Sequence, residues 1–151
     1  MKKTIILVVI GVCMLFTGCN NSFAEKEYNS SEKIAESEDH YAKKNSVFNP
    51  IEGGYSLKVS EFDGRETLWS KRFDDNKDIE IEIHLSLSEG SAKIVYVDEN
   101  GEVLTIAECS SETTKEIDVT KTVSFTSGLN RIKIVGKDCA DIELEILSSD
   151  F

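Results

Sequence analysis

Strict alternation of apolar and polar residues begins after Gly54 and continues almost to the end of the chain. It is clearest in residues 78–88, DIEIEIHLSLS, where isoleucine or leucine occupies every second position from Ile79 to Leu87. Successive side chains of a β-strand point to opposite faces of the sheet. The segment therefore predicts a strand with one buried side and one side facing water.

The same two-residue period predicts seven further strands, which are separated by turn residues. They span Tyr55–Phe62, Thr67–Phe73, Ala92–Asp98, Glu102–Glu108, Glu116–Phe125, Leu129–Val135 and Asp141–Leu147. The pair Asn100-Gly101 between two apolar runs is a strong hairpin signal. No helical pattern follows Gly54, so we expect an all-β domain of about eight strands, a single antiparallel β-sandwich or a barrel.

One face of each predicted strand should contribute to the core. The expected inward residues are Leu57, Val59, Trp69, Phe73, Ile81, Ile83, Ile94, Tyr96, Ile106, Val119, Phe125, Ile132, Ile134, Ile142, Leu144 and Ile146. The segment 93–97, KIVYV, is apolar on both faces. This pattern predicts a strand that is covered on both sides or lies near the centre of its sheet.

A different pattern opens the chain. Lys2 and Lys3 precede an apolar run from Ile5 to Phe16, which is too short for a membrane-spanning helix of about 20 residues. A basic start followed by a short apolar run is typical of an export signal. The run ends in Leu15-Phe16-Thr17-Gly18-Cys19.

This ending resembles the lipobox of bacterial lipoproteins. The resemblance implies that residues 1–18 are a lipoprotein signal peptide and that Cys19 receives the lipid, with palmitate-type acyl chains. Two acyl chains hold a protein stably on a membrane. The expected location is the extracytoplasmic face of the cell membrane, with a plain secretory signal as the alternative.

Residues 19–49 are rich in serine, asparagine, glutamate and lysine and contain few apolar residues. Such a composition predicts a flexible polar tether, with a faint helical stripe at Ile34, Ala35 and Tyr41. The single proline, Pro50, marks the expected start of the sandwich domain at residues 50–151.

The net charge of -11 excludes one class of partner. Nucleic-acid binding depends on clusters of lysine and arginine that contact phosphates, and the sequence has none. The membrane is therefore an expected partner through the lipid alone, beside an extracytoplasmic glycan or protein.

No catalytic constellation is visible in the sequence. The only histidines are His40 and His84, which are too far apart in the chain to form a local metal pair. Residues 74–78, DDNKD, and 98–102, DENGE, have the 1-3-5 spacing of calcium-loop ligands but lack the required glycine and glutamate afterwards. We therefore expect no enzyme activity, no metal site and no cofactor.

Cysteines and aromatic residues offer the remaining candidates. Cys109 and Cys139 could form a disulfide in an extracytoplasmic domain, or remain separate buried thiols. Tyr55, Phe62 and Trp69 are possible ligand-contact aromatics. The parity that Trp69 shares with Phe73 favours a place for Trp69 in the core.

Residues 128–146, GLNRIKIVGKDCADIELEI, resemble the closing strand pair of jelly-roll sandwiches similar to carbohydrate-binding modules. The resemblance implies a jelly-roll-like sandwich but assigns no binding residue. The leading hypothesis is a surface lipoprotein whose sandwich is a non-catalytic binding module for a glycan, wall polymer or protein. A lipid-anchored inhibitor or immunity protein is the main alternative, and a hydrolase is the second.

Overall fold

The computed structural model describes residues 23–151, which form two short helices followed by seven strands. All strand pairs are antiparallel, as predicted from the lack of a helical pattern after Gly54. In chain order the elements are α1 Phe23–Asn29, α2 Ser31–Ala35, β1 His40–Ile51, β2 Gly54–Phe73, β3 Lys77–Ser86, β4 Glu89–Val97, β5 Val103–Ser110, β6 Glu116–Phe125 and β7 Gly128–Leu147.

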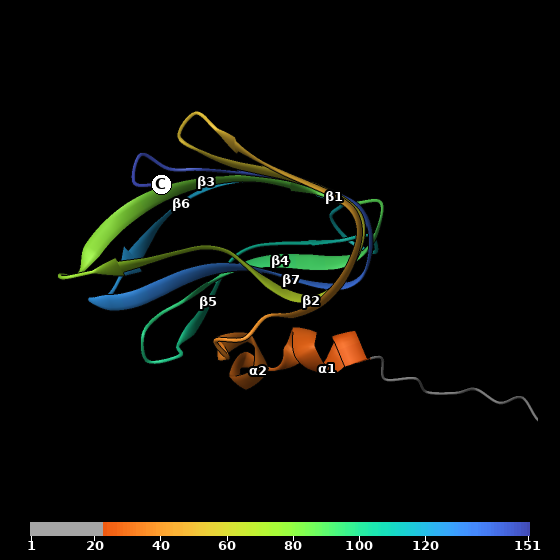
Figure 1. The fold of residues 1–151 in the computed structure, drawn as a ribbon. Helices are drawn as coiled ribbons and strands as arrows, with labels where there is room; N and C mark the ends of the chain where they lie inside the picture. Colours follow the sequence, from red (N-terminus) through yellow and green to blue (C-terminus); the bar gives the residue numbers. More distant parts are fainter. Residues whose placement is uncertain (1–22) are drawn as a thin grey trace, which may run out of the picture.

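Two long strands, β2 and β7, connect the two layers of a β-sandwich. They pair with each other along their whole length. The second half of β7 also pairs with β3, whereas its first half pairs with β4. The first layer thus has the order β1-β2-β7-β3-β6, and the second layer joins β2 and β7 to β4 and β5. Figure 1 shows the curved strands linking the layers on one side.

The strand count differs from the prediction because β2 and β7 each replace two predicted strands. Residues 55–62 and 67–73 belong to one strand, and so do residues 129–135 and 141–147. A β-bulge lies between Phe62 and Gly64, and a bulge bends a strand without ending it. Gly64 has φ 103°, and a Cβ there would lie 2.1 Å from the carbonyl oxygen of His40.

The inner faces of the two layers form the core that the alternation predicted. All the expected inward residues are buried except Phe73 and Val119, which are partly buried against the same cluster. Phe125 lies among three other aromatic rings, with centroid distances of 5.7 Å to Trp69, 5.8 Å to Phe73 and 4.7 Å to Tyr96. The predicted cover on both faces of residues 93–97 is also confirmed. Val95 and Val97 lie on the outer face of the strand and are buried in a second apolar cluster.

The segment expected to be a flexible tether is ordered over its described part, which corrects that prediction. Residues 23–48 include α1, α2 and most of β1, and Cys19 lies outside the described residues. Tyr28 and Ile34 pack on Val95, Val97 and Val135 of the second layer. Figure 1 shows both helices beneath that layer. Neither helix is long and apolar enough to cross a membrane.

Two cations of the second layer, the buried Lys133 and the partly buried Arg131, hold α2. Lys133, which is fully buried, donates to the carbonyl oxygens of Ile34 and Glu36 at 3.3 and 2.7 Å. Arg131 donates to the carbonyl oxygens of Ala35 and Glu36 at 2.9 and 3.0 Å. The last carbonyls of a helix have no partner within the helix, so these two side chains cap α2. Burial lowers the pKa of Lys133 from its ordinary value.

Both cysteines of the sandwich are buried free thiols, so the disulfide alternative does not hold in this structure. The Cys109 thiol donates to the carbonyl oxygen of Leu85 at 3.2 Å, and the Cys139 thiol donates to that of Ser91 at 2.9 Å. Burial raises the pKa of Cys109 to about 11 and that of Cys139 to about 12.

We expect native Cys109 and Cys139 to resist alkylation at about pH 8, where an exposed thiol is partly ionised and reactive. Peptide mapping by mass spectrometry after maleimide treatment would measure the modification of each cysteine. The same treatment in concentrated guanidinium should modify both thiols. Rapid modification of either cysteine in the native protein would contradict the buried positions.

Candidate functional site

The solvent-facing side chains of three neighbouring strands form a polar surface on the first layer. Alternation places one side of β3, β6 and the second half of β7 outward. We call this surface the acidic face, and it comprises Glu80, Glu82, His84, Glu116, Asp118, Glu143 and Glu145. The register places His84 opposite Asp118 on β6 and opposite Glu145 on β7. His84 is therefore flanked by a carboxylate on each neighbouring strand.

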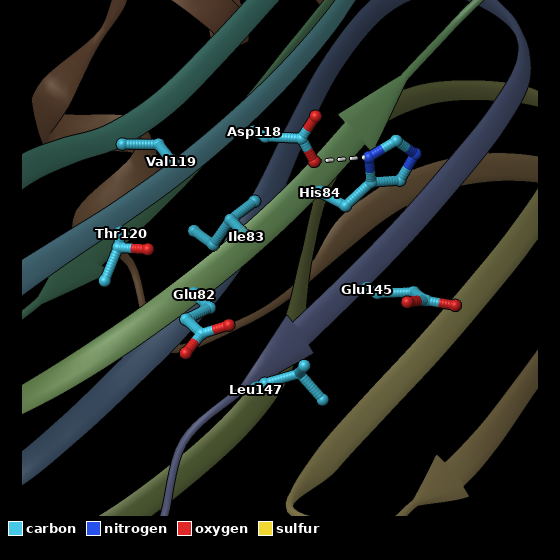
Figure 2. Close-up of a pocket in the computed structure, with 8 residues that line it drawn as sticks. All are labelled: Glu82, Ile83, His84, Asp118, Val119, Thr120, Glu145 and Leu147. Carbon is cyan, nitrogen blue, oxygen red and sulfur yellow. Dashed lines mark hydrogen bonds and ion pairs between the residues drawn. The ribbon is translucent and has the colours of Figure 1, made fainter.

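A shallow depression of about 290 Å³ is hollowed into the acidic face (Figure 2). Its lining is Glu82, Ile83, His84, Asp118, Val119, Thr120, Glu145 and Leu147. A second depression of about 380 Å³ shares His84, Asp118 and Glu145 and extends to Ser56 and Lys58 on β2. The two hollows make a continuous polar surface across β6, β3, β7 and β2.

The His84 imidazole is held by carboxylates on β6. Its Nδ1 lies 2.8 Å from Oδ1 of Asp118, and its Nε2 lies 4.0 Å from Oε1 of Glu116. The hydrogen bond to Asp118 is the main cause that raises the pKa of His84 above its ordinary value. The negative charges of Asp118, Glu116 and Glu145 act in the same direction, against partial burial of the ring.

We expect the His84 ring to titrate above the ordinary histidine pKa of about 6.5, and Asp118→Asn to lower that pKa. Because the pKa is raised in the folded state, the charged ring stabilises the fold below about pH 6.5. This contribution is lost as the pH rises through the folded-state pKa. Proton NMR titration of the His84 ring in the wild type and in the variant would measure it. An unchanged His84 pKa in the variant would contradict the pairing.

Negative charge on the acidic face is only partly compensated. Lys58 pairs with Glu143 at 2.9 Å. Within residues 23–151, Glu82 and Glu145 have no lysine or arginine at ion-pair distance. A hydroxyl, amine or metal ion could therefore be bound by these carboxylates, which are strong hydrogen-bond acceptors.

The predicted ligand-contact aromatics do not lie together on this surface. Phe62 is 1% exposed and is part of the core, so its prediction as a contact residue was wrong. Trp69 also packs in the core, as its parity with Phe73 indicated. Tyr55 is half-buried and stacks on Phe48 with a centroid distance of 5.3 Å. An aromatic platform formed by these three residues is thereby excluded.

Sequence reasoning missed the cluster around His84. The alternation placed His84 and Glu82 correctly on the polar side of β3. Asp118 and Glu145 lie 34 and 61 residues further along the chain, and only the strand register brings them to the ring. Polar residues on the outward sides of β3, β6 and β7 were the one available signal.

No protein-family model matches the sequence, and no curated protein matches it either. Several solved structures resemble part of this chain. They include carbohydrate-binding modules. A mutant carbohydrate-binding module of family 29 has 14% identity over 74% of this chain and 81% of the module, with a TM-score of 0.43. The module CBM6cm-2 from Cellvibrio mixtus lichenase 5A, in complex with cellotriose, has 10% identity and a TM-score of 0.38. The match covers 72% of this chain and 88% of that module.

A larger enzyme also matches this chain. The exo-β-1,3-galactanase of Phanerochaete chrysosporium has 11% identity and a TM-score of 0.41, and the match covers 73% of this chain. The chain spans only 27% of that enzyme. Similarities at this level concern the β-sandwich architecture and carry no argument about a ligand.

Proposed function

We propose that this protein is a lipid-anchored, non-catalytic binding module on the extracytoplasmic face of the cell membrane, and that its acidic face binds a glycan or wall polymer. The anchor is supported by the lipobox-like ending at Cys19. The choice of the acidic face as the binding site is based on a difference between the two layers. The second layer is covered by α1 and α2, whereas no helix or strand among residues 23–151 covers the acidic face of the first layer, which is polar and hollowed.

The position of the helices supports this choice of face. Phe23, where α1 begins, follows Cys19 by four positions in the chain, a stretch that spans at most about 14 Å. A lipid on Cys19 would therefore hold the module close to the membrane through α1. Because α1 packs on the second layer (Figure 1), the acidic face of the first layer would be directed away from the membrane.

Lipidation is tested by replacing Cys19 with serine. Serine lacks the thiolate that accepts the lipid, so Cys19→Ser should abolish incorporation of radiolabelled palmitate and prevent lipoprotein-type processing. Cys139→Ser is the control, because Cys139 is buried in the core. Equal labelling of wild type and Cys19→Ser would end the lipobox interpretation.

Ligand binding is tested with the full chain in detergent micelles on a glycan array and against purified wall polymers. Truncation of Glu82 and Glu145 to alanine should weaken binding at least tenfold, as expected for residues at the centre of a site (about 1 to 2 kcal/mol). Glu32→Ala on α2 is the matched control, because Glu32 is exposed on the other side of the molecule. Equal binding by both variants would contradict the site.

The same assay addresses the hydrolase alternative. Two carboxylates at a suitable separation can hydrolyse a glycosidic bond, and Glu82 and Glu145 line one depression. Cleavage of a bound polymer by the wild type, lost in the double variant, would show that the protein is a hydrolase and not a binding module.

A protein partner is favoured by a different observation, the exposed edge strand β1. Tyr41, Val47, Phe48 and Ile51 are exposed on this strand, and an edge strand has unpaired backbone groups that can pair with another chain. This edge suits the lipid-anchored inhibitor or immunity protein. Capture of an envelope protein by the wild type, lost in Val47→Glu and kept in the Glu82 and Glu145 double variant, would favour it.

A further inference from the structure

Three metal-ligating side chains converge at one end of the acidic face. Suitable donor atoms of His84, Glu116 and Asp118 all lie within 4.8 Å of one another. His84 comes from β3, and the two carboxylates come from alternate positions of the paired strand β6. The cluster differs from a purely acidic patch because an imidazole nitrogen lies within it.

The contact between Asp118 and His84 determines which ring nitrogen is available. An ionised carboxylate only accepts hydrogen bonds, so Nδ1, 2.8 Å from Asp118, carries the proton. In the neutral ring, Nε2 then keeps its lone pair. Histidines that ligate metals usually donate the other ring N–H to a carboxylate or carbonyl group, which orients the ring. Asp118 occupies that position, as the dashed line in Figure 2 shows.

The other ring nitrogen, Nε2, faces a second carboxylate across a gap slightly wider than a zinc ion requires. His84 Nε2 and Glu116 Oε1 are 4.0 Å apart. Nitrogen and oxygen ligands of tetrahedral zinc, each about 2.1 Å from the metal, are about 3.4 Å apart. Closing the gap needs a movement of about 0.6 Å. The Glu116 side chain is 66% exposed and can make this movement without disturbing the core.

The surrounding charges favour a cation, and the nitrogen donor determines its class. Glu145 lies on the other side of His84, and Glu82 lines the same depression. Calcium and magnesium prefer oxygen ligands alone, whereas imidazole suits zinc, copper and nickel.

We propose that the acidic face carries a site for a divalent transition metal ion of the zinc class. His84 Nε2 and the Glu116 carboxylate bind the ion, Asp118 is the positioning residue that orients the ring, and water completes the coordination. The site requires neither the lipid on Cys19 nor a glycan ligand, so it stands or fails independently of the proposed function.

Zinc chloride is the probe. It is titrated into the full chain in detergent, with excess calcium and magnesium present, and isothermal titration calorimetry measures the affinity and the number of zinc ions bound. We expect one zinc ion per chain, with affinity lowered at least about tenfold by His84→Gln and by Glu116→Gln. Loss of an outer-shell partner lowers metal affinity by about 10 to 100-fold, so Asp118→Asn should have an effect in this range. Cobalt substitution should produce visible absorption bands that His84→Gln abolishes.

Two controls are available in the chain. His40→Gln removes the other histidine, and Glu32→Gln removes one negative charge from α2 on the other side of the molecule; both should retain zinc affinity. Without zinc, and at a pH well above the His84 pKa, Asp118→Asn should change the thermal unfolding midpoint little, because the Asp118 side chain is 78% exposed. Unchanged zinc affinity in His84→Gln, an equal loss in His40→Gln, or displacement of zinc by calcium would overturn the site.

Discussion

Replacing Phe125 with alanine is expected to lower the free energy of unfolding by about 3 to 5 kcal/mol, the range for a fully buried phenylalanine. Phe125 is 0% exposed and contacts the rings of Trp69, Phe73 and Tyr96. Its loss leaves a cavity between the two layers that these rings cannot fill completely. Domains of this size are stable by only about 5 to 15 kcal/mol, so the variant should lose a large part of its stability.

Urea denaturation followed by circular dichroism measures this change. Phe48→Ala is the matched control, because Phe48 is 44% exposed on the edge strand β1. The control should cost about 1 kcal/mol or less, since mainly its stacking on Tyr55 is lost. Equal destabilisation by the two substitutions would contradict the position of Phe125 at the centre of the core.

Arg65→Ala is expected to destabilise the fold by about 3 to 5 kcal/mol, because it leaves a buried charge without its partner. Arg65 is buried and forms ion pairs with Glu27 and Glu36. After the substitution, the buried Glu27 carboxylate would have lost the guanidinium that pairs with it. The helices α1 and α2 should detach from the second layer before the sandwich unfolds.

Denaturation curves and limited proteolysis of residues 23–39 measure the two parts of this prediction. Arg72→Ala is the control, because Arg72 is 63% exposed and pairs with Glu99 on the surface; its cost should be at most about 1 kcal/mol. Adding Glu27→Gln to Arg65→Ala should restore part of the stability, since it removes the unpaired charge. No recovery in the double variant would show that the ion pair is not the cause.

The fold class and the core follow from alternation in the sequence. Ile81, Ile83 and Leu85 are buried because a strand directs every second side chain to one face, and this holds whichever strand lies beside it. The apolar outer positions Val95 and Val97 likewise indicated a covered face. The local sequence did not predict that β2 and β7 continue through their bends. Turn residues suggested that a strand ends near Gly64, but the strand only bulges there and its pairing with β7 continues.

What covers Val95 and Val97 was decided only by the tertiary structure. The helices α1 and α2 have seven and five residues, and helices this short are not stable alone. Because the surrounding residues are also polar, the sequence predicted a flexible tether here. They form because Tyr28 and Ile34 bury apolar area on Val135 and its neighbours, and because Arg65 and Lys133 satisfy their charges and terminal carbonyls.

The candidate site was likewise determined partly by the sequence and partly by the tertiary structure. The sequence by itself determined that His84 lies on the polar side of β3, because parity along one strand is a local property. Only the tertiary structure placed Asp118 and Glu145 beside the ring, because a shift of one residue between strands would move every side chain of a neighbour to the opposite face. Register depends on how all the strands pack together, and no single segment of the chain contains that information.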